Sequence, residues 1–264
     1  MLSWKYIITH NFPDEIVIYL LSDVHYGALE HNTTAWESVL KEILAEPNRY
    51  CVLNGDLISN GTKNSLTNCF DEIVRPRDQK KYMVEALAPI KERILCLTRG
   101  NHEYRNKDVD NDITYDIASK LDIEDLYRPE IAFLNIRLGS RGEKNPNSAR
   151  NSYNIAVTHG TGGGVLSGST INRNERTGNI IENLDVFIVG HTHKGIISRP
   201  SKLVIDPVNG IVEQRDYVVI SCVSWMEYGG YAASKMLLPA AHSRPQKILL
   251  GKNGYGQKDI RIVW

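Results

Sequence analysis

The stretch IVIYLLSDVH, residues 16–25, sets the pattern from which the fold follows. Six hydrophobic residues run without interruption and then give way to Ser, Asp and His. An apolar run of this length indicates a strand that is buried on both faces. Similar runs recur along the chain at 50–53, 94–98, 155–158, 186–189 and 217–221. We therefore predict six buried strands.

Helical patterns separate several of these runs. Thr34 and Glu37 form a capping box, and the apolar residues after them recur on one helical face up to Pro47. A second helix is predicted over 78–88, ahead of a proline, and a third after Asp112 as its N-cap. Strands that alternate with helices predict an α/β architecture built in layers.

Two polar stretches rich in Gly, Asn and Ser, at 139–152 and 160–178, predict connecting loops. Neither loop divides the chain, because candidate functional residues lie on both sides of each. We therefore predict a single domain over residues 1–264. A chain of this length buries a large core without disulfides or structural metals.

Composition excludes several classes of protein. The 264 residues are 42% hydrophobic, and 31 Lys and Arg balance 31 Asp and Glu. These values exclude a disordered chain, a collagen, and a protein whose whole surface is basic for coating nucleic acid. The four cysteines lack metal-site spacing, and the three within or next to apolar runs are expected to be buried thiols (Cys51, Cys96, Cys222). Without a signal peptide or an apolar run of about 18 residues, we expect a cytoplasmic protein with no membrane partner.

The residues that follow five of the apolar runs share one chemistry. Ligands collect beyond the carboxyl ends of strands in sheets of this type. Five of the eight histidines lie at these positions, together with two aspartates and one asparagine. The endings read Ser22-Asp23-Val24-His25, Asn54-Gly55-Asp56, Arg99-Gly100-Asn101-His102-Glu103, His159-Gly160 and Gly190-His191-Thr192-His193.

These side chains predict a metal centre. Carboxylate oxygen, amide oxygen and imidazole nitrogen form a mixed O/N ligand shell without thiolate. Seven candidates are too many for one tetrahedral ion, and they suit two ions about 3.5–4 Å apart. On extended backbone, residues i and i+2 point to the same side, so the pairs Asp-x-His and His-x-His each reach one cluster. The candidate ligands are Asp23, His25, Asp56, Asn101, His159, His191 and His193.

The same series of motifs, spread over residues 16–193, resembles the calcineurin-like metallophosphoesterase superfamily. The resemblance implies a four-layer αββα sandwich of two mixed β-sheets flanked by helices, with a dinuclear site at one edge. It implies a first metal held by Asp23, His25, Asp56 and His193. It also implies that Asp56 bridges to a second metal, which Asn101, His159 and His191 complete. We expect two divalent cations, Mn²⁺ first, with Fe and Zn²⁺ also suited to this shell.

The resemblance implies a hydrolase acting on phosphoester bonds. Two cations make hydroxide available near neutral pH for attack on phosphorus. His102 stays off the metals, faces the substrate, and either protonates the leaving oxygen or stabilises its charge. Glu103 either orients His102, or only caps or pairs with Arg105. Arg99 and Arg105 flank the motif and either contact phosphate or are solvated.

The substrate is expected to be a phosphodiester, either nucleic acid (DNA or RNA) or a nucleotide-like compound. The protein phosphatase branch carries an arginine shortly after its Gly-Asp pair, whereas here the residues after Asp56 are LISNGT. A basic path for nucleic acid would come from the Lys/Arg excess after Tyr231 or from basic residues at 137–150 and 173–176. Phosphomonoesterase activity or a silent binding scaffold remain as alternatives.

Two further stretches have competing readings. The Gly-rich residues 161–164 either approach a phosphate through backbone N–H groups or form a plain loop. The aromatic residues of 224–231 either stack on a base or pack in the core or in a dimer contact.

Overall fold

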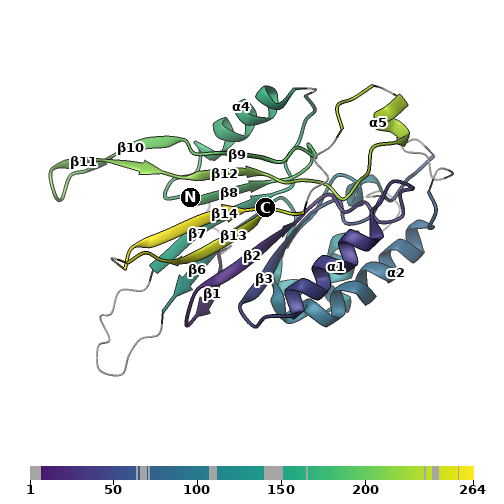
Figure 1. Ribbon diagram of the computed structural model, residues 1–264, viewed down its shortest axis with the longest axis horizontal. Coiled ribbons are helices and arrows are strands. Elements are labelled where there is room, and N and C mark those ends of the chain that lie inside the picture. The colour runs from purple at the N-terminus through teal and green to yellow at the C-terminus, as the bar shows by residue number, and fades with distance from the viewer. Residues whose placement is uncertain are drawn as a thin grey trace.

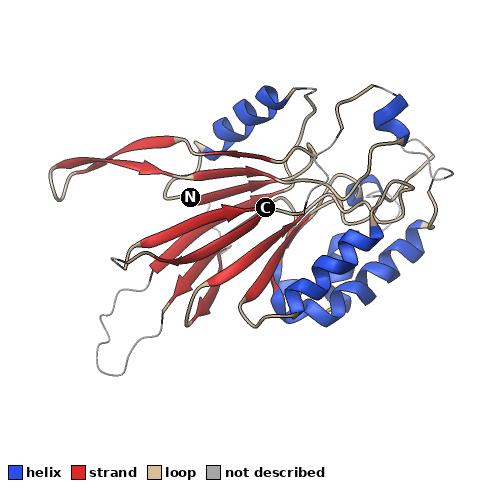
Figure 2. Ribbon diagram, viewed as in Figure 1, coloured by secondary structure: helices blue, strands red, loops and turns tan. Residues whose placement is uncertain are grey.

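Two six-stranded sheets face each other in the computed structural model, with helices on their outer sides (Figure 2). This is the expected α/β arrangement of two mixed sheets between helices. The structure describes residues 7–63, 65, 70, 72–106, 112–139, 151–164, 166–234, 236–239, 244–254 and 256–264.

Sheet I contains the first three predicted strands, and its order is β14-β13-β2-β3-β4-β5. β2, β3, β4 and β5 run parallel, and β13 joins β2 antiparallel. Its strands are β2 (Ile16–Leu21), β3 (Arg49–Asn54), β4 (Ile94–Thr98), β5 (Tyr127–Arg128), β13 (Lys247–Lys252) and β14 (Lys258–Val263).

Sheet II contains the other three predicted strands, in the order β1-β6-β7-β8-β12-β9. β7, β8 and β12 run parallel at its centre. Its strands are β1 (Ile7–Phe12), β6 (Ile131–Leu138), β7 (Asn151–Thr158), β8 (Val186–Val189), β9 (Ile196–Ser198) and β12 (Val218–Ser221). The hairpin of β10 (Ser201–Asp206) and β11 (Ile211–Asp216) extends beyond the sheet (Figure 1).

Helices cover the outer faces of both sheets. Figure 1 shows α1 and α2 side by side next to sheet I, and α4 on the opposite side of the molecule. The helices are α1 (Thr33–Leu44), α2 (Pro76–Leu87), α3 (Ile113–Lys120), α4 (Ser167–Gly178) and α5 (Gly230–Ser234), with short 3₁₀ helices at Ala88–Arg93, Glu103–Asn106 and Glu124–Leu126.

Alternating side chains of the strands build separate apolar layers. Between the sheets, Ile18 and Leu20 of β2 pack in one cluster with Val157 of β7 and Ile188 of β8. On the other face of β2, Tyr19 and its neighbours pack against α1, α2 and α3. A smaller cluster covers the outer face of sheet II. Because β2 is buried on both faces, its sequence shows no polar alternation.

Two predicted helix boundaries are wrong by a few residues. Helix α1 is capped by Asn32, whose side chain accepts the backbone N–H of Ala35, so Thr34 and Glu37 form no capping box. Helix α2 starts at Pro76 and ends at Leu87, and Pro89 lies in the first turn of the 3₁₀ helix that follows, Ala88–Arg93. Proline is favoured at a first helical turn, where its missing N–H costs nothing.

Asp112 does cap α3, accepting the backbone N–H groups of Thr114 and Tyr115. The prediction of a loop over 160–178 is wrong, because α4 occupies its second half. The buried positions of α4 are Thr170, Asn174 and Gly178, so the helix presents no apolar stripe for a periodicity search to find.

Other expectations are settled by burial. Cys51, Cys96 and Cys222 are buried free thiols, and burial raises the pKa of each. Of the predicted loop 139–152, residues 151 and 152 belong to β7 and residues 140–150 lie outside the described residues. Within the part of the chain that the structure describes, no helix has the length and apolarity that crossing a membrane requires.

Candidate metal centre

The candidate ligands meet where the strands of both sheets end. Asp23 and His25 follow β2, Asp56 follows β3, and Asn101 follows β4, all in sheet I. The three remaining histidines follow β7 and β8 in sheet II. The site therefore joins the two sheets, whereas the sequence indicated a single sheet edge.

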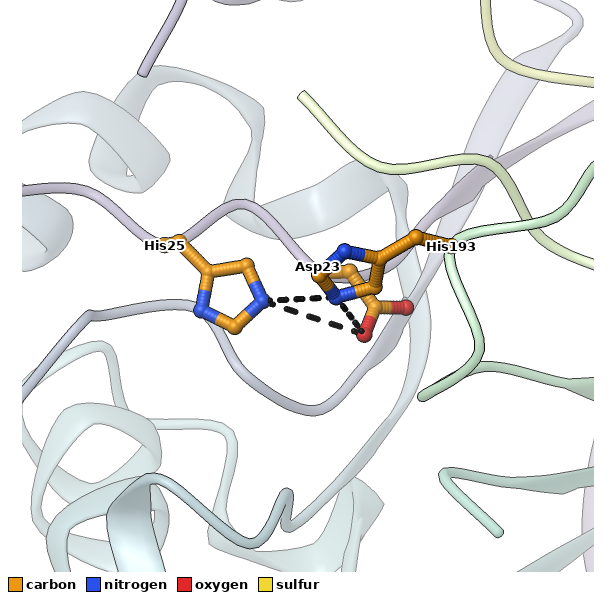
Figure 3. A group of neighbouring side chains, drawn as sticks. All are labelled: Asp23, His25 and His193. Carbon is orange, nitrogen blue, oxygen red and sulfur yellow. Dashed lines mark hydrogen bonds and ion pairs between the residues drawn. The ribbon is translucent and has the colours of Figure 1, made fainter. Parts of the chain in front are cut away.

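One group of ligands consists of Asp23, His25 and His193, which point toward one another in Figure 3. The Nε2 atoms of the two histidines lie 3.0 Å apart, and Oδ1 of Asp23 lies 3.2 Å from His193 Nε2 and 3.9 Å from His25 Nε2. Asp23 and His25 are buried, and His193 is partly exposed. The group therefore opens to solvent through His193.

A second group consists of Asp56, His159 and His191. Oδ2 of Asp56 lies 3.1 Å from His159 Nε2. Oδ1 of Asn101 lies 3.1 Å from the same nitrogen and 2.7 Å from His191 Nδ1. Oδ1 of Asn101 therefore lies close to both imidazoles.

The donor spacing fits divalent cations. Ligand atoms about 2.1 Å from one ion lie about 3 Å apart when they are neighbours in its shell. Most of the donor contacts above, between 2.7 and 3.2 Å, match that spacing. Asp56 Oδ2 is also 3.8 Å from His25 Nε2, so this oxygen lies between the two groups. The residues therefore fit two ions that share Asp56.

Backbone conformation at the ligands differs from the extended one expected. Asp23 and His25 have φ values of 53° and 51°, and His191 and His193 have 70° and 56°. Asp56 is also left-handed, at 49°. Such conformations are rare for residues other than glycine and cluster at functional sites. The paired ligands converge because tight turns with left-handed backbone conformation direct their side chains to one place. The alternation of side chains along an extended strand does not contribute.

Two glycines permit close approach of the loops. A Cβ atom on Gly100 would lie 2.1 Å from the backbone nitrogen of Asp56, and one on Gly190 would lie 2.3 Å from Ser22 Oγ. Gly55 and Gly160 have φ values of 71° and 80°, a left-handed backbone conformation that glycine adopts without strain.

Backbone N–H groups hold the two carboxylates in place. The N–H of His102 donates to Asp56 Oδ1 at 2.8 Å, which leaves Oδ2 directed at the imidazoles. The N–H of His191 donates to both oxygens of Asp23, and Ser22 Oγ donates to Asp23 Oδ2. Each carboxylate is thereby fixed before any ion arrives.

His159 is oriented in a similar way. Its Nδ1 lies 2.9 Å from the backbone carbonyl oxygen of Asn54, to which it donates. One proton is therefore on Nδ1, so Nε2 is the atom that would bind an ion after losing its own proton. The carbonyl of Asn54 gave no signal in the sequence, because any residue supplies one.

Glu103 caps backbone N–H groups, which is one of the roles that the sequence left open. Its buried carboxylate accepts four backbone N–H groups, those of Asp56, Leu57, Ile58 and Gly100, at 2.6–3.2 Å. Burial and the charge of Asp56 raise the pKa of Glu103 to about 7. Glu103 therefore fixes the loop after β3 to the loop after β4.

His102 lies beside the seven candidate ligands, and with His25 and Asp56 it forms a third group of possible metal donors. Its Nε2 is 3.8 Å from Asp56 Oδ2, and its Nδ1 donates to the carbonyl of Ser59 at 2.6 Å. Nη2 of Arg105 lies 2.8 Å from the Nε2 atom. Burial lowers the pKa of His102 to about 4, and the Arg105 charge acts in the same direction. The imidazole is therefore a neutral acceptor for Arg105.

The charges of the site favour cation binding. Burial raises the pKa of Asp23, but His193 and His159 outweigh it and hold the value at about 2. Burial lowers the pKa of His159, but Asp56 and Asp23 outweigh it and raise the value to about 10. Two buried carboxylates thus attract positive charge strongly enough to keep a proton on a buried imidazole. A bound cation would take the place of that proton.

Other candidate groups have structural partners. Arg99 pairs with Asp112 and Glu130 at 2.9 Å each, so it is not simply solvated. Trp225 is buried against Trp36 with ring centroids 5.2 Å apart, which confirms core packing for this part of 224–231.

The Gly-rich loop is held by cations from its own chain. Arg173 of α4 donates to the carbonyls of Thr161, Gly162 and Gly163, and Lys194 donates to that of Gly164. The contacts involve the carbonyl side of the loop, and they attach it to α4 and to the residue after His193.

Comparisons with solved structures give matches over most of the chain at low similarity. Vps29 from Chaetomium thermophilum is 10% identical, with 94% of each chain covered and a TM-score of 0.37. A conserved uncharacterised protein of Streptococcus pneumoniae TIGR4, described as a predicted phosphoesterase, is 12% identical, with coverage of 94% and 97% and a TM-score of 0.37. The calcineurin-like phosphoesterase YfkN from Bacillus subtilis is 12% identical, with coverage of 94% and 90% and a TM-score of 0.39.

No curated protein sequence matches the chain. Residues 16–195, more than half of the chain, match the family described as calcineurin-like phosphoesterase. This range begins with β2, includes all seven candidate ligands and ends two residues after His193. The chain therefore belongs to the calcineurin-like phosphoesterase family.

Proposed function

We propose that this protein is a hydrolase that cleaves phosphodiesters, of nucleic acid or a nucleotide-like compound, with the help of two divalent cations. The observation that carries the proposal is the set of converging donor atoms in two groups that share Asp56 Oδ2. Such a pair of ions would supply a hydroxide nucleophile near neutral pH and neutralise the oxygens of the phosphate.

Each side chain then has a defined task. Asp23, His25 and His193 would hold one ion, and Asn101, His159 and His191 would hold the other, with Asp56 shared. His102 binds no ion and faces the substrate, where its Nε2, once protonated, would donate to the leaving oxygen. The contact of Arg105 with His102 Nε2 supports leaving His102 out of the ion shells, because a nitrogen that accepts from a guanidinium is not directed at a cation.

The diester preference rests on the segment after Asp56. Residues 57–62 contain no cation, and Leu57 and Ile58 are buried. A dianionic monoester would favour a cation within this segment in addition to Arg105, which donates to the carbonyl of Ser59 from outside it. Mn²⁺ is the first choice of metal for the mixed O/N shell, with Fe and Zn²⁺ as substitutes.

Nucleic acid as the diester has less support from the charges of the C-terminal segment. Lys247 pairs with Glu42 and Lys258 pairs with Asp185, both at 2.8 Å. Arg261 lies 2.9 Å from Asp259. These ion pairs reduce the positive potential that a phosphate backbone requires. A small diester is therefore the first substrate to assay.

The test compares bis-p-nitrophenyl phosphate with p-nitrophenyl phosphate at equal Mn²⁺, with an EDTA-treated sample as control. We expect hydrolysis that needs the metal and a higher kcat/KM for the diester. A higher kcat/KM for the monoester would contradict the diester assignment. A protein that binds two ions and hydrolyses neither compound would contradict the assignment as a hydrolase and support a binding scaffold.

A further inference from the structure

Gln79 of α2 is a buried amide whose hydrogen bonds lead to the loop beside His102. The residue is 0% exposed. Its Oε1 accepts the backbone N–H of Asn60 at 2.9 Å, and its Nε2 donates to Glu72 Oε2 at 2.8 Å and to the carbonyl of Val74 at 2.7 Å. Because both partners of Nε2 are acceptors, they fix the orientation of the amide and direct Oε1 at Asn60.

The peptide group that Gln79 holds is the one that orients His102. The N–H of Asn60 and the carbonyl of Ser59 belong to the same planar group and point in opposite directions. That carbonyl accepts the Nδ1 hydrogen of His102 at 2.6 Å, and it also accepts from Arg105 at 2.9 Å. The carbonyl therefore faces the imidazole in the same orientation of the peptide in which the N–H faces Gln79.

This orientation of the peptide is one that the backbone disfavours. Asn60 is buried and has a φ of 43°. Left-handed backbone is uncommon outside glycine, although Asn adopts it more readily than most residues. A flip of the peptide between Ser59 and Asn60 would make that φ negative, and it would turn the carbonyl away from His102. A conformation of this kind persists when its surroundings hold it, and Gln79 supplies the hold on the N–H side.

We infer that Gln79 is a positioning residue, which fixes the peptide between Ser59 and Asn60 so that the Ser59 carbonyl keeps the imidazole of His102 directed at the leaving oxygen. The inference rests on the proposed function, in which His102 donates to that oxygen. The carbonyl accepts the Nδ1 hydrogen in both the neutral and the cationic imidazole, so the ring keeps its orientation while Nε2 gains and gives up its proton. Gln79 acts through the peptide.

A competing role for Gln79 involves the loop after β2. A Cβ atom on Gly27 would lie 2.3 Å from Gln79 Nε2, so the side chain also packs against the residue two positions after His25. If this packing were its main task, loss of the amide would release the ion proposed at Asp23, His25 and His193. Metal content therefore separates the two roles.

Gln246 provides the matched comparison. It is also 0% exposed, and its amide likewise binds backbone groups, accepting the N–H of Val223 at 3.3 Å and donating to the carbonyl of Ser221 at 2.8 Å. These partners lie at the end of β12 in sheet II. Gln79→Met and Gln246→Met therefore remove the same buried amide, but only the first removes an acceptor from the peptide that orients His102.

The test is a double-mutant cycle on the hydrolysis of bis-p-nitrophenyl phosphate, with each substitution made in the wild-type protein and in His102→Ala. We expect Gln79→Met to lower kcat about tenfold with KM unchanged and both ions retained, and to lower it less than about twofold once His102 is absent. Gln246→Met should change kcat by the same factor in both backgrounds. Gln79→Glu, which keeps an acceptor oxygen for Asn60, should restore part of the rate.

A second measurement needs neither metal nor activity. Histidine ¹⁵N NMR of the EDTA-treated protein, with the His102 signal assigned by its loss in His102→Ala, reports which ring nitrogen carries the proton. We expect the proton on Nδ1 in wild type and a mixture of both tautomers in Gln79→Met. If Gln79→Met does not fold, Gln79→Asn, whose shorter side chain retracts the same amide, takes its place with the same expectations.

Equal losses of kcat in the two backgrounds, no loss in the wild-type background, or release of an ion by Gln79→Met would overturn the inference while the active wild-type enzyme upholds the proposed function. An unchanged tautomer of His102 in Gln79→Met would also overturn it. A wild-type protein that holds two ions and cleaves no ester would overturn the proposed function, and the tautomer would then decide by itself whether Gln79 positions the imidazole.

Discussion

Replacing Glu103 by Gln tests how the site is held together before any ion binds. Oε1 of Glu103 accepts the N–H groups of Leu57 and Ile58, and Oε2 accepts those of Asp56 and Gly100. Glutamine has the same shape but only one acceptor oxygen. Its amide nitrogen would face two backbone N–H groups, whichever way the side chain is turned.

The magnitude follows from those two donors. A buried donor left without an acceptor costs about 1–3 kcal/mol, so two of them cost about 2–6 kcal/mol. Removing the buried charge offsets part of this, since burial and the charge of Asp56 raise the pKa of Glu103 to about 7. We therefore expect Glu103→Gln to lower the free energy of unfolding by about 2–3 kcal/mol.

Urea denaturation in EDTA measures this loss without a contribution from bound metal. Fluorescence of Trp36 and Trp225, both buried in the core beside sheet I, reports the transition. Glu85→Gln is the matched control. The carboxylate of Glu85 is exposed, and its ion pair with Lys81 at 3.7 Å contributes about 0.5 kcal/mol or less to the free energy of unfolding. A Glu103→Gln protein as stable as this control would refute the proposed attachment between the two loops.

Four other substitutions follow from the geometry. Asp56→Asn should abolish activity and occupancy of the second site together, whereas His102→Ala should lose rate with both ions retained; elemental analysis and bis-p-nitrophenyl phosphate hydrolysis check both. Gly190→Ala should lower the melting temperature, because its Cβ has no room beside the Asp23 loop. Burial raises the pKa of Glu42, but hydrogen bonds to Lys247 and Tyr19 outweigh burial and lower the pKa. At pH 7 the free energy of unfolding of wild type should therefore exceed that of Glu42→Gln by roughly 0.5–1 kcal/mol. This difference should vanish as the pH falls through the lowered pKa of Glu42.

The strands that carry the ligands were predictable because they are buried on both faces. β2, β4 and β8 have the bounds that their apolar runs indicated. Strands with one exposed face are harder to recognise: β10 alternates exposed and half-buried residues over Ser201–Asp206, and it was missed. Helix α4 was taken for a loop, since Thr170, Asn174 and Gly178 on its buried face resemble loop residues.

In the site too, some features were predictable from the sequence and others were not. Side chains that follow a strand were found from the sequence, because the chain order alone brings strand ends together. The contacts that orient them were not, since the carbonyls of Asn54 and Ser59 belong to the backbone and carry no residue signature. Capping by Glu103 was one of several roles left open, and its partners were not identified, because only the fold brings four N–H groups of two loops to one carboxylate.

Anomalous diffraction from crystals of the protein soaked in MnCl₂ tests the central claim most directly. The account predicts two peaks about 3.5–4 Å apart on either side of Asp56 Oδ2. One peak should contact Asp23, His25 and His193, and the other should contact Asn101, His159 and His191. No peak at these residues, or a single ion bound elsewhere on the chain, would contradict it.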